Sequence, residues 1–301
     1  MTVRGTQSFV HILSECWYRP SLLALELLWR WLFGLPFLAV LWFAGSRIWA
    51  QTSAQLTAAG IDQFSLQNPN QAAVIVADSY AVLWPPVLHV ALWLVPAAVL
   101  GWSVLSGIGR TLVLRRYDPS LPSRPVALVL LQLLRLIALG GCFVLWFAAI
   151  HWSANATLSG EEPNLVAYFA VVICLSLGIF TLWALASWVF SIAPLLVLLE
   201  DRSIVGSLVR SLRLGSLTGK LVEINLVMGI IKLALVVLAM VFSATPLPFA
   251  SVMQCPPLYI WWGIVTLLYL AASDFFQVAR LVAFIRLWRL SVVDGKVSFR
   301  G

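Results

Sequence analysis

Residues 165–199 read LVAYFAVVICLSLGIFTLWALASWVFSIAPLLVLL and contain no charged side chain. A helix needs about 20 mostly apolar residues to cross the hydrocarbon core of a bilayer. This stretch is longer than that, so we expect it to tilt or to continue as a helix beyond the membrane. Pro194 removes one backbone hydrogen bond near its end and should kink it. The stretch therefore predicts a membrane-spanning helix.

The composition of the whole chain supports the same class. Of the 301 residues, 61% are hydrophobic and only 10% are charged, whereas soluble domains contain about 25% charged residues. A soluble fold would have too little polar surface to cover this much apolar surface. We therefore predict an all-α, polytopic membrane helical bundle that forms a single integral membrane domain over residues 1–301.

Five further apolar stretches of sufficient length occur along the chain. The Trp residues at many of their ends suit the headgroup level of a bilayer. The six predicted transmembrane helices cover about residues 30–49, 82–108, 126–152, 165–199, 222–244 and 258–279.

The loops between these spans alternate in charge. Those at 50–81, 153–164 and 245–257 contain no Lys or Arg, and Arg47 is the one exception near them. The loops at 110–125 and 200–221 and the C-terminal segment are rich in Arg and Lys. Because basic loops stay in the cytoplasm, this pattern predicts that both termini are cytoplasmic.

Residues 202–219 read RSIVGSLVRSLRLGSLTG and predict an amphipathic helix with a basic polar face at the cytoplasmic membrane surface. This helix either lies on anionic lipid and merely connects two spans, or docks a cytoplasmic partner or covers a cavity. The candidate residues for contact with the membrane surface or a partner are Arg202, Arg210, Arg213 and Lys220.

The loop at 51–81 is polar and carries no catalytic constellation. Ser53 to Ala59 and Gln71 to Val82 could each form a short helix, separated by Asn68-Pro69-Asn70.

Ionisable side chains inside spans are costly and often mark function. Arg135 and Lys232 each lie roughly 15 Å from the inner edge of a span, and Asp274 roughly 9 Å, at 1.5 Å per residue. After snorkelling these groups could meet, so we predict a polar cluster of Arg135, Lys232 and Asp274, with Gln132 one turn lower. The cluster either fixes helix packing or lines a path for a substrate or proton. Glu26 and Arg30, four residues apart, indicate a local interfacial pair.

Motifs for catalysis, nucleotide binding or metal binding are absent from the sequence. The four Cys have no metal-binding spacing, and His89 and His151 differ in depth and lack the second pair that haem ligation would suggest. We therefore expect no catalytic residue, no metal and no cofactor, and no nucleic-acid partner. Any enzymatic chemistry would have to take place in or at the membrane.

The run from Ser191 to Arg202, SIAPLLVLLEDR, is followed by Ser207-Leu-Val-Arg-Ser-Leu-Arg-Leu214. This pattern resembles the six-helix membrane domain attached to some bacterial glycerophosphodiester phosphodiesterases, and its stand-alone relatives. The resemblance covers about 30 residues and implies the six-span layout in a bacterial cytoplasmic (inner) membrane. The phosphodiesterase barrel is missing, so the resemblance implies no such activity.

These observations favour a non-enzymatic membrane scaffold or accessory subunit that handles a lipid or amphipathic ligand. The expected partners are membrane lipid and a cytoplasmic or membrane protein subunit. The alternative is a small transporter or permease subunit, which the cations inside the spans favour. An intramembrane enzyme is the third interpretation.

Overall fold

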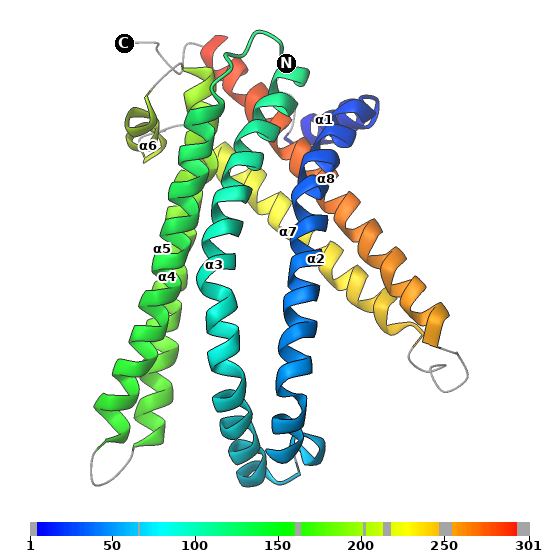
Figure 1. Cartoon of the computed structure of the whole chain (residues 1–301). Helices are drawn as coiled ribbons and strands as arrows, with labels where there is room; N and C mark the ends of the chain where they lie inside the picture. The colour runs from blue at the N-terminus through cyan, green and yellow to red at the C-terminus, as the bar shows by residue number, and fades with distance from the viewer. Residues whose placement is uncertain are drawn as a thin grey trace. The chain divides into compact units, whose positions relative to one another are not determined.

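The computed structural model describes residues 5–65, 67–159, 164–200, 203–212, 218–246 and 255–293, and in these residues it contains helices and no strand. The elements in chain order are α1 (Gly5–Trp17), α2 (Pro20–Ala58), the short 3₁₀ helix η1 (Ile61–Gln63), α3 (Pro69–Tyr117), α4 (Pro125–Leu158), α5 (Leu165–Leu199), α6 (Ile204–Leu212), α7 (Thr218–Ala244) and α8 (Cys255–Val293), as coloured in Figure 1.

Six of these helices, α2, α3, α4, α5, α7 and α8, are long and apolar enough to cross a membrane. The prediction of six such helices is confirmed, and α5 has the predicted bounds. Most of the others extend well beyond the predicted spans, because polar residues at their ends continue the helix. Pro36, Pro85, Pro86, Pro96 and Pro194 all lie inside these helices, which continue past them.

The loop predicted at 51–81 is mostly helical. The two short helices that we expected there are the end of α2 and the beginning of α3. Gly60 has φ 81, a left-handed conformation that glycine adopts without steric cost, and it separates α2 from η1.

Helix α1 was missed at the level of the sequence, because it is too short to be a span. Its Ile12 and Cys16 are buried in a cluster with Leu22 of α2 and with Val278 and Val282 of α8. The helix therefore packs on α8 with one apolar face.

The chain divides into two compact units, residues 1–28 with 106–301, and residues 29–105. We call them unit 1 and unit 2. The core of unit 1 is built around α8, which has the largest buried share among the six candidate spans. One cluster joins its Ile285 and Trp288 to α3, α4 and α5, and another joins its Val278 and Val282 to α1, α2 and α7.

Helices α7 and α8 of unit 1 form an antiparallel pair. Near the loop between them, the indole N–H groups of Trp261 and Trp262 donate to the carbonyls of Phe242 (2.8 Å) and Ser243 (3.0 Å). Towards the other end of the pair, Met228 of α7 shares a cluster with Val278 of α8. These contacts fix the register between the two helices.

Helices α4 and α5 form a second hairpin in unit 1. The Trp146 indole donates to the Ser176 hydroxyl at 2.9 Å, which joins the two helices within the apolar region. The side chain of Asn164 accepts from the Ala167 N–H at 2.9 Å and caps the beginning of α5.

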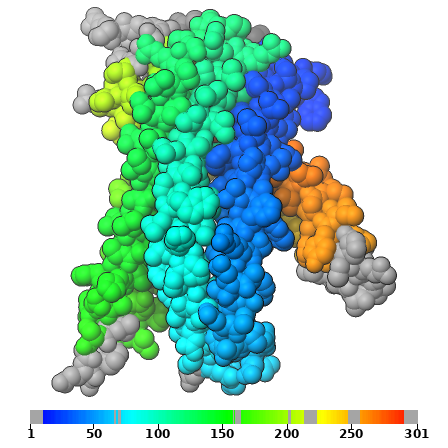
Figure 2. Space-filling view, in the orientation of Figure 1, coloured from blue at the N-terminus to red at the C-terminus, as the bar shows by residue number. Residues whose placement is uncertain are grey.

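Helix α6 packs against α5 in unit 1, where Figure 2 shows it on the flank of the green helices. Its Ile204 and Leu208 pack near Ala193 and Val197 of α5. Helix α6 buries its serines and exposes several apolar side chains, and its expected place at a membrane surface stays a prediction. The buried residues are Ser207 and Ser211, and the exposed ones include Val205, Val209 and Leu212.

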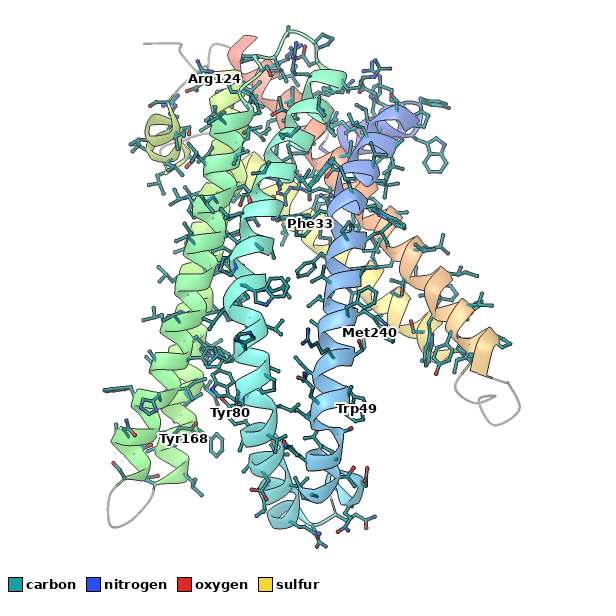
Figure 3. The ribbon with its side chains drawn as sticks, viewed as in Figure 1. Phe33, Trp49, Tyr80, Arg124, Tyr168 and Met240 are labelled. Carbon is teal, nitrogen blue, oxygen red and sulfur yellow. The ribbon has the colours of Figure 1, made fainter. Side chains whose placement is uncertain are left out.

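In unit 2, aromatic side chains join α2 to α3. Phe33 points from α2 towards α3 (Figure 3) and meets the Trp102 ring edge-on, with centroids 5.3 Å apart. Trp29 lies 5.4 Å from the same Trp102 ring, centroid to centroid. Offset and edge-on aromatic pairs of this kind stabilise helix packing beyond the area that they bury.

Gly107 marks the closest approach between α3 and α4 in unit 1. A Cβ atom at this position would lie 2.7 Å from the backbone nitrogen of Val129 and 2.9 Å from its Cα. We predict that Gly107→Ala lowers the free energy of unfolding by roughly 1–3 kcal/mol through overpacking. Thermal unfolding in detergent measures the change. Gly140→Ala on α4, where a Cβ meets nothing within 4 Å, is the control, and equal unfolding temperatures for the two variants would contradict the prediction.

Candidate functional site

The predicted polar cluster lies entirely in unit 1, on three of its helices. Gln132 of α4 and Asp274 of α8 are buried, with 7% and 5% of their surfaces exposed. Arg135 of α4 is partly buried and Lys232 of α7 is exposed on the surface of its span. Their meeting in one cluster stays a prediction.

The register of α7 and α8 places Lys232 and Asp274 at the same level. Met228 and Val278 share a cluster, and one turn further towards the loop between the helices leads to Lys232 on α7 and to Asp274 on α8. Because the helices run antiparallel, both steps go in the same direction. A flexible lysine stem at this position can bring its ammonium group towards a neighbouring carboxylate.

The structure adds Arg280, a residue that we assigned at first to the basic C-terminal segment. Arg280 lies close enough to Arg135 for their charges to repel each other. Its side chain is partly buried, and its Nε atom is fully enclosed. The proximity of Arg280 and Arg135 could not be predicted from the sequence, because it depends on which faces of α4 and α8 meet.

Glu26 is completely buried in unit 1, at 0% exposure. Its expected local pair with Arg30 stays a prediction. Its neighbour one turn earlier, Leu22, packs with Val278 of α8. Glu26 and Asp274 are thus two of the buried carboxylates of unit 1, and the cations Arg135, Lys232 and Arg280 lie on α4, α7 and α8 of the same unit.

These five groups can interact in two ways. Carboxylates and cations buried in low dielectric stabilise one another only when they are paired and hydrogen-bonded. Such a group can fix the rotation of four helices, or it can exchange protons or ions along a path. Both alternatives need the acidic members.

The basic residues predicted to dock on the membrane surface are described only in part. Arg210 of α6 forms an ion pair with Glu200 at 3.7 Å between Nε and Oε1, and the Glu200 side chain is almost fully buried. Arg202, Arg213 and the side chain of Lys220 lie outside the described residues. Arg210 thus ties α6 to the end of α5, and its contact with lipid or a partner stays a prediction.

A second polar region lies where α1, the end of α3 and α8 meet; we call it the basic end of unit 1. Arg286 of α8 forms an ion pair with Glu15 of α1, and its Nη1 atom lies 3.2 Å from Nδ1 of His11. Arg289 of α8 forms an ion pair with Asp118, which also accepts from the Ser120 hydroxyl at 2.7 Å. These pairs attach α1 and the α3–α4 loop to α8.

Cys16 lies beside this region, but its thiol is not activated as a nucleophile. Burial, with a smaller effect of the Glu15 carboxylate, raises the pKa of its thiol to about 11, against the opposite influence of Arg286 and Arg19. The thiol is therefore protonated near neutral pH and is a poor nucleophile. Among the described residues there is also no group of three or more His, Cys, Asp or Glu that could hold a metal ion.

Unit 2 contains an apolar groove between α2 and α3. Its volume is about 380 Å³, and every residue that lines it is apolar. Helix α2 contributes Phe37, Leu41, Ala44, Gly45 and Ile48, and α3 contributes Val87, Val90, Ala91, Leu94, Val95, Ala98 and Val99. The sequence indicated these positions only as parts of spans, because a groove depends on the distance between two helices.

The fold defines a multi-pass helical membrane protein. Comparisons with protein-family models, with curated proteins and with solved structures found no match. The resemblance to the membrane domain of phosphodiesterases therefore stays a prediction.

The buried carboxylate of Asp274 offers a direct test of the polar cluster. We predict that Asp274→Ala lowers the free energy of unfolding by about 3–5 kcal/mol, because it removes the buried counter-charge of the cations in the predicted cluster. Thermal unfolding in detergent measures the loss, and Asp62→Ala in the exposed η1 helix should change little. Wild-type stability of Asp274→Ala would show that the cluster does not exist.

Proposed function

We propose that the chain is a non-enzymatic membrane protein, a scaffold or accessory subunit that binds a lipid or another amphipathic ligand. The observation that carries this proposal is the apolar groove of unit 2. Small-molecule sites are usually concave, largely apolar and of about 300–1,000 Å³, and the groove falls within that range at about 380 Å³.

The occupant that fits the groove is the acyl chain of a membrane lipid. Both walls belong to candidate membrane spans, so hydrocarbon chains surround them. Small residues line part of the groove, and they leave space that a flexible acyl chain can fill. They are Ala44, Gly45, Ala91 and Ala98. The lining offers no polar group that would favour a polar solute.

We further propose that the protein resides in the cytoplasmic (inner) membrane of a bacterium with both termini in the cytoplasm. The alternation of basic and non-basic loops supports this orientation. It places the basic end of unit 1 at the cytoplasmic leaflet, and it places η1 outside.

A small transporter or permease subunit is the second candidate. The charged residues within the spans of unit 1, Arg135, Lys232 and Asp274, favour it, because intramembrane charges often form ion or proton paths. Substrate movement that depends on a proton gradient would support this candidate over the scaffold.

Filling the groove tests the lipid proposal. We predict that Gly45→Leu reduces the number of lipid molecules that the protein retains, because the new side chain enters the groove while its Cβ meets nothing within 4 Å. Native mass spectrometry after gentle extraction counts the retained lipid. Gly34→Leu on the same helix, also open at its Cβ but outside the groove, should retain lipid as the wild type does. Equal retention by both variants would reject the groove as the site.

Cysteine accessibility tests the proposed orientation. In a cysteine-free background, Gln63→Cys in η1 should react with a membrane-impermeant maleimide in intact cells, and Ser203→Cys before α6 should react only after the membrane is opened. Both positions are exposed in the structure, so access to the reagent depends on the side of the membrane. The reverse labelling pattern would contradict the orientation.

A further inference from the structure

A cavity of about 360 Å³ opens at the basic end of unit 1. Tyr117 from the end of α3 lines it together with Ile285, Arg286, Arg289 and Leu290 of α8. Two arginines and a tyrosine thus line one space that also has an apolar side. This combination differs from the groove of unit 2, whose lining has no polar side chain.

The two arginines are held in place by neighbours and still remain accessible. Glu15, His11 and the Tyr117 hydroxyl contact Arg286, while Asp118 and Ser120 contact Arg289. Their side chains are nevertheless 36% and 54% exposed. Within the described part of the chain, the hydrogen bonds of Arg289 run through Nη2 alone. A guanidinium group has five N–H donors, so further donors remain for a ligand.

The cavity lies beside aromatic residues that suit the headgroup level of a bilayer. Trp17 and Tyr18, at the end of α1, are largely exposed, and such side chains favour the boundary between water and hydrocarbon. The next residue, Arg19, lies over the Tyr117 ring, 5.6 Å from its centroid. A ligand in the cavity would therefore meet both water and lipid.

We propose that this cavity binds a phosphate group, and that the phosphate is the headgroup of a membrane lipid. Arginine forks match phosphate oxygens in a bidentate manner and remain charged at every physiological pH. Ile285 and Leu290 supply the apolar contact that a glycerolipid offers and that free phosphate lacks. The inference rests on the proposed lipid-binding function and adds the chemical class of the headgroup.

The internal ion pairs make the proposal testable by opposite effects. Asp118 competes with a bound phosphate for Arg289, so Asp118→Asn should strengthen phosphate binding severalfold. Arg289→Gln removes a charged hydrogen bond and should weaken it about tenfold. A purely structural ion pair would make both variants less stable without changing ligand affinity in opposite directions.

The experiment titrates the purified full chain in detergent with three probes, phosphatidic acid, diacylglycerol and inorganic phosphate, and measures binding by native mass spectrometry. We expect phosphatidic acid to bind far more tightly than diacylglycerol, with the opposite shifts in the two variants. Arg47→Gln, the same change at an exposed arginine of α2, should bind as the wild type does. Thermal unfolding shows whether each variant is folded. If Arg289→Gln does not fold, the change in phosphatidic acid affinity of Asp118→Asn tests the proposal by itself.

The three probes separate the sources and the outcomes. Tighter binding of phosphatidic acid than of inorganic phosphate supports the lipid headgroup, and equal binding assigns the site to free phosphate. Equal binding of diacylglycerol and phosphatidic acid, or shifts of the same sign in both variants, would overturn the phosphate site. If Gly45→Leu still reduced the number of retained lipid molecules, the proposed lipid-binding function would remain supported although the phosphate site was rejected.

Discussion

The burial of the last part of α8 is the constraint on which unit 1 depends. Residues 278–288 of α8 contribute to both of its larger core clusters, and these clusters contain side chains from α1, α2, α3, α4, α5 and α7. Lipid tails are as apolar as leucine, so burial gives little drive for helix association inside hydrocarbon. Close packing has to hold the helices there, and Ala279 and Ala283 permit it because small side chains let helices approach closely. Further along the same helix, Arg286 forms an ion pair with Glu15 and Arg289 forms one with Asp118.

The sequence predicted the number and kind of the spans well, because lipid imposes its requirements on composition. A helix such as α5 carries apolar residues on all sides, and lipid is the solvent that suits a charge-free run of 35 residues. The same argument did not predict helix α1, since it is too short to be a span and buries Ile12 and Cys16 on one face, as many short amphipathic segments do. Helix α6 lies within the stretch where we expected an amphipathic helix, and it buries its small serines while Val205 is exposed, because the packing on α5 decides which side chains are covered.

The candidate site was less predictable than the fold. Depth along a helix can be counted from the sequence, and this count selected Asp274 and Gln132, which are both buried in the structure; their meeting with Arg135 and Lys232 stays a prediction. The rotation of a helix about its axis cannot be counted in this way, and this rotation decides whether Arg280 lies near Arg135 and whether Glu26 is enclosed. The same limit hid the cavity at Tyr117, which two segments distant in sequence, the end of α3 and the end of α8, build together.

The two candidate ligand sites differ in the ligand chemistry that they favour. The groove of unit 2 offers contact without hydrogen bonds, so it selects for apolar chains and discriminates weakly among them. The cavity of unit 1 offers Arg286 and Arg289, whose acidic partners already satisfy much of their charge. A ligand there competes with the internal ion pairs, so its binding free energy is only the part of its attraction to the arginines that exceeds theirs. A monoanion is therefore bound less strongly than a phosphate monoester, which has a higher charge. Glu15 and Asp118 therefore determine how much negative charge a headgroup needs in order to bind, and the two arginines determine where its oxygen atoms bind.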